Sequence, residues 1–347
     1  MMRRWREENM QQNTAVIRLD HIRRNGELLR MRAGAKLCAV VKADGYGHGA
    51  AEAARALTGV ADMFAVALVD EGMRLRLSCP SDILVLVPAL SEEEAARGIF
   101  AGLVFSVGDA ADYALLSRAA QKLGKTARCH LQVNTGMNRF GFDLADFSAF
   151  TKSNRAPGVR IEGIYSHFYR PEDAAVTEGQ FVRFQVFCNL AESAFGPLVK
   201  HIAATGGVIA DEKYALDMVR PGIGLYGYLP EGFAGALPVK KAMHIYASAV
   251  TSRSYEGGGA GYGVYEGKRG SPLSAVRCGY ADGFFRSGGI GNVNSLCMDA
   301  CLYPQKLEKY GRVCIFSDAD VYARRHGTIS YEVLVHAGRR AVRFYVG

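Results

Sequence analysis

A lysine at the end of an apolar run is the first candidate for chemistry in this chain. Residues 40–49 read VVKADGYGHG, so Lys42 follows a short strand-like stretch and precedes a glycine-rich turn that carries Tyr46. A poorly hydrated lysine has a lowered pKa, and its neutral amine is the nucleophile that Schiff-base chemistry requires. A lysine at a strand end can also simply extend its charge into solvent. The turn favours the first interpretation, because its glycines allow the backbone to approach a bound anion, which Tyr46 could also reach.

A framework of alternating strands and helices is expected to position this lysine. The expected strands are Lys36–Val41, Met63–Leu68, Ile83–Val87, Leu103–Val107, Ala127–Val133, Ile161–Ser166, Val199–Ala204 and Gly222–Tyr226. Amphipathic helical stretches between them include Ala51–Leu57, Ala110–Leu123 and Gly179–Phe195. Eight βα units of this length predict a parallel (β/α)8 TIM-type barrel rather than an open sheet.

The pattern changes after Pro238. Short alternating runs, MHIYASAV, LSAVRCGYA, RVCIFS and RAVRFYV, are separated by glycine-rich turns. Such runs are typical of a mainly antiparallel β domain. We therefore expect an N-terminal tail over residues 1–12, an α/β barrel over 13–240 and a β domain over 241–347.

The polar residues of the barrel region follow a rule of barrel enzymes, whose sites lie at the C-terminal ends of the strands. The candidates in this region share that placement: Lys42 after the first expected strand, Gln132 to Arg139 after the fifth, His167 after the sixth, Thr205 and Gly206 after the seventh, and Gly222 and Ile223 at the start of the eighth. Their side chains and backbone groups are expected to converge on one site.

The composition is that of an ordinary globular protein. Of the 347 residues, 49% are hydrophobic and 22% are charged, and the formal net charge is +8. A basic run occurs only at the N-terminus, without basic-aromatic repeats, so no nucleic-acid partner is expected. No apolar run reaches the roughly 18 residues of a membrane span, and no signal-peptide pattern opens the chain. We expect a cytoplasmic protein with no membrane partner.

The cysteines are scattered rather than grouped. The chain has eight of them and no CxxC pair. Neither a disulfide framework nor a zinc site follows from this spacing, and reduced, buried thiols are expected. No metal site is predicted.

Further motifs recur in order along the chain: VNTGMNRFG, YSHF, DMVRPGIGLYG, GYG, GYADG, CMD and SYEV. With VVKADGYGHG they resemble the alanine racemase family of pyridoxal 5'-phosphate (PLP) enzymes, over roughly Thr14 to Val346. The resemblance implies a barrel followed by a β domain, which the strand near Thr14–Asp20 joins. It also implies a Schiff base between Lys42 and PLP.

The resemblance implies a particular set of groups for the cofactor phosphate. They are the hydroxyl group of Thr205, the backbone N–H groups of Gly206, Gly222 and Ile223, and the hydroxyl groups of Tyr46 and Tyr331. Such convergent donors can hold a dianion without a lysine.

The same resemblance assigns the acid/base chemistry. Arg220 would donate a hydrogen bond to the pyridine nitrogen, and since an arginine cannot release its proton, that nitrogen would stay unprotonated. This favours return of a proton to the α-carbon over transamination. Lys42 and Tyr262 would act on opposite faces of the α-carbon, with His167 between Tyr262 and Arg220. Tyr262 would come from the partner subunit of a homodimer with composite sites.

Substrate contacts are also implied by the resemblance. Arg139 would lie near the phenolic oxygen of PLP and the carboxylate of a small amino acid. A backbone group of Met298 would contact the same carboxylate. Three further residues would orient Tyr262 and shape the entrance: Tyr280, Arg286 and Asp299.

Two features depart from the family pattern. Many members have a carbamylated lysine where this chain has Gln132, and an aspartate where it has Asn134, so two negative charges near Arg139 are missing. The amide of Gln132 could hold the guanidinium by a hydrogen bond, or an anion such as chloride could replace the charge. The segment 284–296 is also shorter than is common in the family.

Several functions remain open at this stage. Racemisation of alanine, supplying D-alanine for peptidoglycan, comes first, because Tyr331 narrows the pocket around a small side chain. The shorter segment would allow a serine or broader-specificity racemase. A barrel-type PLP decarboxylase conflicts with Arg220 and Tyr262. A non-catalytic PLP-binding protein conflicts with the presence of residues 241–347.

Overall fold

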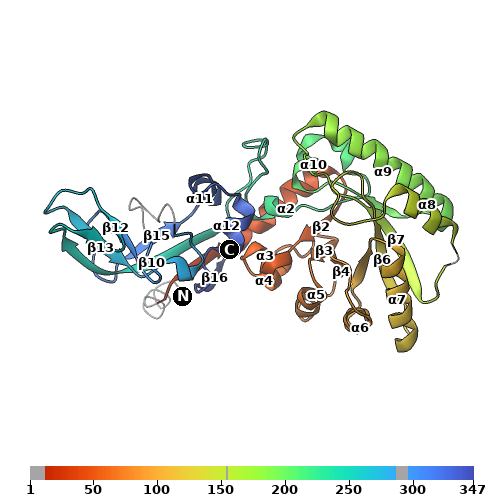
Figure 1. Cartoon of the computed structure of the whole chain (residues 1–347), viewed down its shortest axis with the longest axis horizontal. Coiled ribbons are helices and arrows are strands. Elements are labelled where there is room, and N and C mark those ends of the chain that lie inside the picture. The colour runs from red at the N-terminus through yellow and green to blue at the C-terminus, as the bar shows by residue number, and fades with distance from the viewer. Residues whose placement is uncertain (1–11, 154, 287–295) are drawn as a thin grey trace. The chain divides into compact units, whose positions relative to one another are not determined.

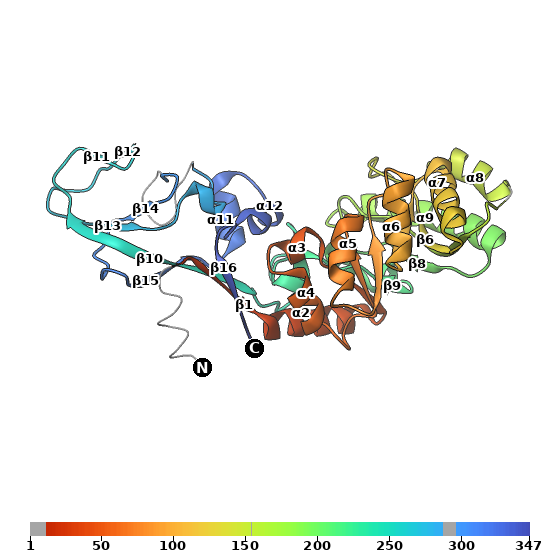
Figure 2. The ribbon, with the colours of Figure 1, turned by 90° about the horizontal axis from the view of Figure 1, so that it is seen from below.

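The computed structural model describes residues 12–153, 155–286 and 296–347 (Figures 1 and 2). These residues divide into two compact units. The barrel unit contains Ile22–Gly45 and Ala50–Lys240. The β unit contains the described residues up to His21, the short segment Tyr46–Gly49, and Lys241–Gly347.

The barrel unit is built on a parallel sheet. In the described part of the chain, eight strands follow the order β8-β7-β6-β5-β4-β3-β2-β9 (Figure 1). Their bounds are β2 (Lys36–Val40), β3 (Met63–Val66), β4 (Asp82–Val85), β5 (Val104–Val107), β6 (Ala127–Gln132), β7 (Val159–Tyr165), β8 (Val199–His201) and β9 (Met218–Val219). Backbone hydrogen bonds from Asp217 N–H to Lys200 O (3.2 Å) and from Arg220 N–H to Ala203 O (2.8 Å) link the two outer strands. The predicted barrel is therefore confirmed.

The predicted eighth strand was wrong in position. The structure places β9 at Met218–Val219 and a 3-10 helix, η2, at Ile223–Tyr226, where a strand was expected. Pro221 explains the difference, because it has no N–H group to donate to a ladder. Gly222 and Ile223 therefore follow the strand instead of opening it. The seventh strand is also shorter than predicted and ends at His201.

Helices alternate with these strands, as predicted. They are α2 (Leu19–Ala33), α4 (Ala50–Ala56), α5 (Val69–Arg76), α6 (Glu92–Phe100), α7 (Ala110–Leu123), α8 (Leu144–Lys152), α9 (Ala174–Phe195) and α10 (Thr205–Ala210). Capping residues determine where α7 begins and ends. The side chain of Asp109 accepts from Asp112 N–H at its start, and Gly124, in the left-handed region, terminates it. Helix α9 begins earlier than expected, where Asp173 caps it.

The β unit contains a second sheet. Among the described residues it has six strands, ordered β14-β13-β10-β1-β16 with β15 paired to β10 (Figure 2). They are β1 (Thr14–Arg18), β10 (Met243–Ser254), β13 (Pro272–Val276), β14 (Cys301–Tyr303), β15 (Arg312–Phe316) and β16 (Val342–Val346). Only the β1–β16 pair is parallel within this described sheet. The prediction of a mainly antiparallel domain is confirmed, and β1 pairs with β10 and β16 within it.

The β unit also contains helices that the sequence did not predict. Helices α11 (Ala319–His326) and α12 (Ser330–His336) lie between β15 and β16. Asp318 accepts hydrogen bonds from the N–H groups of Asp320 and Val321 at the start of α11. A short hairpin, β11 (Gly259–Ala260) and β12 (Gly263–Val264), precedes β13.

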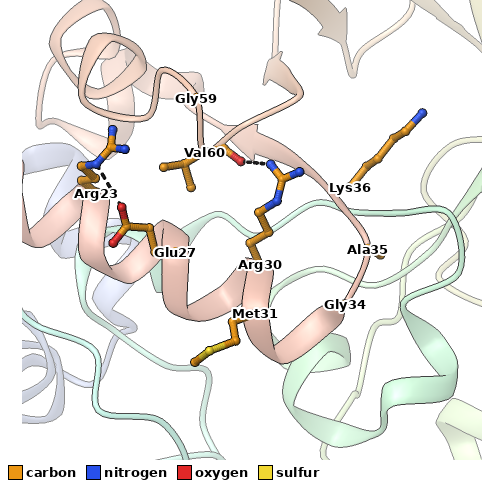
Figure 3. A pocket seen from close by; sticks show the side chains of 9 residues that line it. All are labelled: Arg23, Glu27, Arg30, Met31, Gly34, Ala35, Lys36, Gly59 and Val60. Atoms are coloured by element: carbon orange, nitrogen blue, oxygen red, sulfur yellow. Dashed lines mark hydrogen bonds and ion pairs between the residues drawn. The ribbon is translucent and has the colours of Figure 1, made fainter.

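A hollow of about 540 Å³ in the barrel unit lies beside Lys36, at the start of β2 (Figure 3). Two of its cations are already engaged: Arg23 pairs with Glu27 at 3.0 Å, and Arg30 donates to the carbonyl group of Val60. Lys42 follows the opposite end of the same strand. The hollow is therefore at the end of the barrel where residues usually serve stability, and it is not the candidate active site.

Candidate active site

Lys42 begins a turn whose backbone is left-handed. The turn, α3 (Lys42–Tyr46), has left-handed backbone angles at Ala43 (φ 51°, ψ 48°), Asp44 (φ 51°, ψ 52°) and Gly45 (φ 62°, ψ 43°). The side chain of Lys42 is partly buried. Burial lowers the pKa of its amine, the positive charge of Arg139 lowers it further, and Glu71 opposes both effects. The amine is therefore more nucleophilic at neutral pH than that of a solvated lysine.

Arg220 lies deep in the barrel unit, with 3% of its surface exposed. Its guanidinium donates to Nδ1 of His201 at 2.7 Å and to the carbonyl group of Ser166 at 2.6 Å, and it approaches Nδ1 of His167 at 3.5 Å. The ring of Tyr165 lies beneath it, 4.8 Å from the guanidinium carbon. Fixed contacts thus hold the arginine in one orientation.

The contacts of Arg220 fix the tautomers of two buried histidines. Because arginine only donates, Nδ1 of His201 must accept, and the proton of this imidazole sits on Nε2. That nitrogen donates to Nδ1 of His130 at 2.7 Å. Burial lowers the pKa of His130 to about 4 and that of His201 well below its usual value. Arg220 therefore keeps its charge beside two neutral imidazoles.

His167 is a third uncharged histidine in this region. It follows β7, and burial followed by the positive charges of Arg220, Arg139 and Lys42 lowers its pKa to about 3. At neutral pH its ring can accept one hydrogen bond and donate another. It cannot act as a cation.

Thr205, Gly206, Gly222 and Ile223 form a set of buried polar groups. The Thr205 hydroxyl oxygen accepts from the N–H groups of Gly222 (3.2 Å) and Gly224 (3.3 Å). Within the described residues, no hydrogen-bond acceptor is found for the N–H groups of Gly206 and Ile223, which are buried. Buried donors without acceptors are costly unless a ligand satisfies them. This set therefore fits an anion such as a phosphate.

Gly206 also shows why a side chain is excluded there. A Cβ atom at this position would lie 2.5 Å from Cγ of Pro171. The backbone at Gly206 is thus closely covered on one side.

Arg139 and Gln132 do not contact each other in the way considered from the sequence. Gln132 is 7% exposed, and its Oε1 atom has no hydrogen-bond partner, so it does not hold the Arg139 guanidinium. Arg139 is exposed and lies 5.6 Å from the ring of Phe140. Asn134 instead organises the turn before Arg139, with Oδ1 accepting from the N–H groups of Gly136 and Asn138.

Two tyrosines lie together in the β unit. The rings of Tyr46 and Tyr331 are 6.3 Å apart between centroids, with Tyr331 on α12. Burial raises the pKa of Tyr46, with a smaller contribution from Tyr331, and burial raises the pKa of Tyr331 to about 12. Both hydroxyl groups therefore stay protonated at neutral pH.

The GYADG and CMD motifs are bound to each other through their backbones. The N–H groups of Tyr280 and Ala281 donate to the carbonyl groups of Cys297 (3.1 Å) and Met298 (3.0 Å). Tyr280 begins the 3-10 helix η3 (Tyr280–Asp282) and is partly buried, whereas the Met298 side chain is 53% exposed. The close approach requires Gly279, where a Cβ atom would lie 2.3 Å from both carbonyl oxygens.

Arg340 joins the carboxylates of the same two motifs. Its Nε and one terminal nitrogen donate to Asp282 at 3.1 and 2.8 Å, and the other terminal nitrogen donates to Asp299 at 2.9 Å. The structure thus pairs Asp299 with Arg340. Arg286 is exposed.

Tyr262 stands at the tip of the β11–β12 hairpin, with 79% of its surface exposed. Its neighbour Val264 is 88% exposed. An aromatic side chain presented in this way can reach a second molecule.

Comparison with known proteins decides the family. Residues 17–230 match the family described as alanine racemase, N-terminal domain. Alanine racemase 2 of Oceanobacillus iheyensis is 34% identical over 341 residues, which cover 90% of this chain and 87% of the relative. The chain belongs to the alanine racemase family.

Solved alanine racemase structures agree with this assignment. The enzyme from the D-cycloserine producer Streptomyces lavendulae has a TM-score of 0.89 at 28% identity, over 97% of each chain. The enzyme from Bartonella henselae, described with covalently bound pyridoxal phosphate, has a TM-score of 0.85 at 26% identity, over 96% of this chain and 99% of that one. The chain is an enzyme of the alanine racemase type, an isomerase built on a TIM-like barrel.

The described residues contain neither a membrane-spanning helix nor a metal-binding cluster. No helix there is both long and apolar enough to cross a bilayer. No group of three or more potential metal ligands comes together. The eight cysteines, all within the described residues, are free thiols; Cys314 is exposed and Cys297 partly exposed, so the expectation of burial was wrong for these two.

Four residues among these candidate groups were missed by sequence reasoning: His130, His201, Glu71 and Arg340. Each acts through a partner far away in the sequence. The two histidines did carry a signal, because they interrupt apolar strands, in CHLQ and VKHIA, and a buried polar group needs a partner. Glu71 and Arg340 stand among other charged residues and carried no such signal.

Proposed function

We propose that the chain is a PLP-dependent racemase that interconverts L- and D-alanine, with Lys42 and Tyr262 as its two acid/base groups. The observation that carries the proposal is the setting of Arg220, a buried donor between His201, Ser166 and His167. PLP, when bound, withdraws electrons from the α-carbon of an amino acid and so acidifies its α-proton.

The chain's own groups match the needs of this cofactor. Lys42 holds PLP covalently. The phosphate would be held by the otherwise unmatched N–H groups of Gly206 and Ile223 and by the hydroxyl groups of Thr205, Tyr46 and Tyr331. The N–H group of Gly222 supports this set indirectly, because it donates to the Thr205 oxygen.

Arg220 selects the outcome of the reaction. Because it donates and never accepts, it would hold the pyridine nitrogen of PLP in its unprotonated form. His201 and His130 help Arg220 to keep its proton and its orientation, because both stay neutral: His201 accepts from Arg220, and His130 accepts from His201. The α-carbon is therefore where a proton returns.

Proton transfer needs one group on each face of the α-carbon. The lowered pKa of Lys42 makes its amine able to accept a proton. Tyr262, at the exposed tip of its hairpin, supplies the other face from the partner subunit of a homodimer. His167, uncharged, accepts from Arg220 at Nδ1, so its Nε2–H group donates to the hydroxyl oxygen of Tyr262 and stabilises the working orientation of the tyrosine.

Small amino acids fit the remaining groups. Among the described residues Arg139 has no carboxylate partner, so it is available for the carboxylate of the substrate, together with a backbone group of Met298. Tyr331 limits the side chain to the size of alanine. Tyr280, Arg286 and Asp299 shape the entrance, and the product D-alanine serves peptidoglycan synthesis in the cytoplasm.

The test is deuterium exchange followed by NMR. The full chain, with PLP added, is incubated in D2O with L-alanine and, in parallel, L-serine, and both α-proton loss and chirality are recorded. Racemisation of alanine much faster than that of serine is expected. Faster serine turnover would replace alanine as the substrate. Bound PLP without exchange of either amino acid would indicate a carrier or a decarboxylase of a basic amino acid.

A further inference from the structure

We propose that Glu71 is a positioning residue for Lys42: its carboxylate holds the left-handed turn that follows the lysine and supplies the negative charge that balances the cations around the amine. The inference rests on the proposed role of Lys42 as the residue that binds PLP. Glu71 belongs to the first turn of α5 and lies 29 positions after Lys42 in the sequence.

The turn after Lys42 needs external support. Ala43, Asp44 and Tyr46 all have φ angles of 51°, in the left-handed region that non-glycine residues avoid. Cβ of such residues crowds the backbone carbonyl, so each adds strain that the surrounding structure must overcome. A strained backbone beside a candidate nucleophile points to a functional constraint on where that nucleophile is held.

The Glu71 carboxylate provides this support from two sides. Oε1 accepts from the N–H group of Ala43 at 2.8 Å, and Oε2 accepts from the N–H groups of Ala67 (2.7 Å) and Leu68 (3.4 Å). One carboxylate therefore ties the residue after Lys42 to the segment after β3. Hydrogen bonds between an ionised carboxylate and backbone N–H groups are among the stronger ones in proteins.

Asp44 completes the restraint from within the turn. Its Oδ1 accepts from the N–H group of Ala50 at 2.9 Å, at the start of α4, and the N–H group of Gly45 donates to Val41 O at 2.8 Å. Neither contact reaches another strand of the barrel. Glu71 thus links the turn to the segment that follows the neighbouring strand.

Charge gives Glu71 its second effect on Lys42. The charged and titratable groups around the amine in the barrel unit are Glu71 from α5, Arg139 after β6 and His167 after β7. Arg139 and burial disfavour the ammonium form, and Glu71 favours it. Without Glu71 the amine would bind its proton more weakly, and the balance needed for both accepting and returning a proton would be lost.

The experiment measures the Lys42 amine directly. The full chain is freed of PLP with hydroxylamine, and acetylation of each lysine is followed by mass spectrometry across pH. In Glu71→Gln the pKa of Lys42 should fall, and labelling of Lys42 at neutral pH should become about threefold faster. Unchanged labelling of Lys42 in a folded Glu71→Gln protein would overturn the proposal.

A neighbouring carboxylate supplies the matched control. Asp70 lies in the same helical turn, but it pairs with Arg97 at 2.7 Å on the surface instead of contacting Ala43. Asp70→Asn removes the same charge from α5 and should leave Lys42 labelling as in the wild type. An equal shift in Asp70→Asn would show that only the net charge matters and would overturn the positioning role.

Two more variants separate geometry from charge, and the second of them, Glu71→Asp, does not depend on Glu71→Gln folding. Ala43→Gly relieves the left-handed strain, so in the Glu71→Gln background it should restore thermal stability and PLP uptake without restoring the pKa of Lys42. Glu71→Asp keeps the charge with a shorter reach, so it should keep that pKa while weakening PLP uptake. The proposal would be overturned if Ala43→Gly restored neither stability nor PLP uptake and Glu71→Asp took up PLP as the wild type does.

The outcome is also distinguishable from that of the proposed function. Lys42 labelling is measured without cofactor or substrate. A shifted labelling profile in a chain that does not racemise alanine would contradict the proposed function alone. Racemisation with an unshifted profile would contradict only the role of Glu71.

Discussion

The groups around Arg220 in the barrel unit and around Asp282 in the β unit are stabilised by different means. Around Arg220, the histidines are buried and uncharged, and the arginine is held by neutral acceptors. Around Asp282, by contrast, Arg340 is exposed and pairs with two carboxylates. Burial keeps the histidines around Arg220 neutral, and ion pairing with Arg340 lowers the pKa of Asp282 against the effect of burial. We therefore expect the stability that the groups around Arg220 contribute to depend on pH. The stability that the pairs of Arg340 contribute should depend on salt and on the loss of a single partner.

The largest expected effect concerns Lys42. Lys42→Ala should lower kcat for alanine racemisation by about 10⁴-fold or more, because it removes both the covalent attachment of PLP and one acid/base group. The control is Lys36→Ala, at the exposed opposite end of the same strand, which should retain wild-type kcat. Near wild-type activity of Lys42→Ala would show that this buried position is not the catalytic one.

Tyr262 tests whether an exposed residue of the β unit can be as essential as a buried one. Tyr262→Phe should lower kcat by about 10²- to 10³-fold. Mixing inactive Tyr262→Phe with inactive Lys42→Ala should restore about a quarter of the activity, because half of the dimers are hybrids and each hybrid has one intact composite site. Absence of any restoration after verified subunit exchange would mean that Tyr262 does not act across a dimer.

The pH dependence of stability tests whether the buried histidines around Arg220 are neutral. The pKa of His130 is about 4 in the folded chain and about 6.5 in the unfolded chain. Between these pH values the unfolded chain therefore binds more protons than the folded one. Stability should therefore fall as the pH drops through this window, by on the order of 2 kcal/mol for His130 between pH 7.5 and 5.

Urea unfolding at the two pH values measures this effect. His130→Gln retains an acceptor for Nε2 of His201 and should reduce the difference between pH 7.5 and 5. If the variant showed the same pH dependence as the wild type, His130 would not be the neutral, buried group that the structure indicates.

The smallest effects are expected at the two ends of the Arg340 pairing. Arg340→Ala leaves the carboxylate of Asp282, whose side chain is only 4% exposed, without its cation and should destabilise the fold by about 1–3 kcal/mol. Asp299→Asn removes an exposed partner and should cost less than about 1 kcal/mol, with little effect left at high salt. Urea unfolding at low and high salt compares the two, and equal losses would contradict the difference in burial.

Much of the barrel could be predicted because its strands are short, apolar runs with polar residues after them. Ile83–Val85 and Phe64–Val66, for example, are wholly buried. The eighth strand could not be placed in this way, because the apolar run Ile223–Tyr226 looks like a strand while Pro221 prevents the ladder from reaching it. Helices α11 and α12 were missed because the surrounding runs have the alternation of strands.

The candidate site was predictable only as a set of motifs. Lys42, Arg220 and Thr205 are each marked by glycine- or proline-rich neighbours, and their motifs have a recognisable order. His130 and Glu71 lack such marks, since their importance comes from a hydrogen bond to a residue that only folding brings near. Gln132 was found, but its missing hydrogen bond could not be predicted from the residue type.

The close packing at Gly279 has an evolutionary consequence. Every mutation of its codon that changes the residue adds a Cβ atom, which would meet the carbonyl oxygens of Cys297 and Met298 at 2.3 Å. Gly279 can therefore be replaced without loss of stability only if the CMD segment moves first. The GYADG and CMD motifs should consequently be inherited as one unit, and a natural variant that lacks this glycine should carry a compensating change around residue 298.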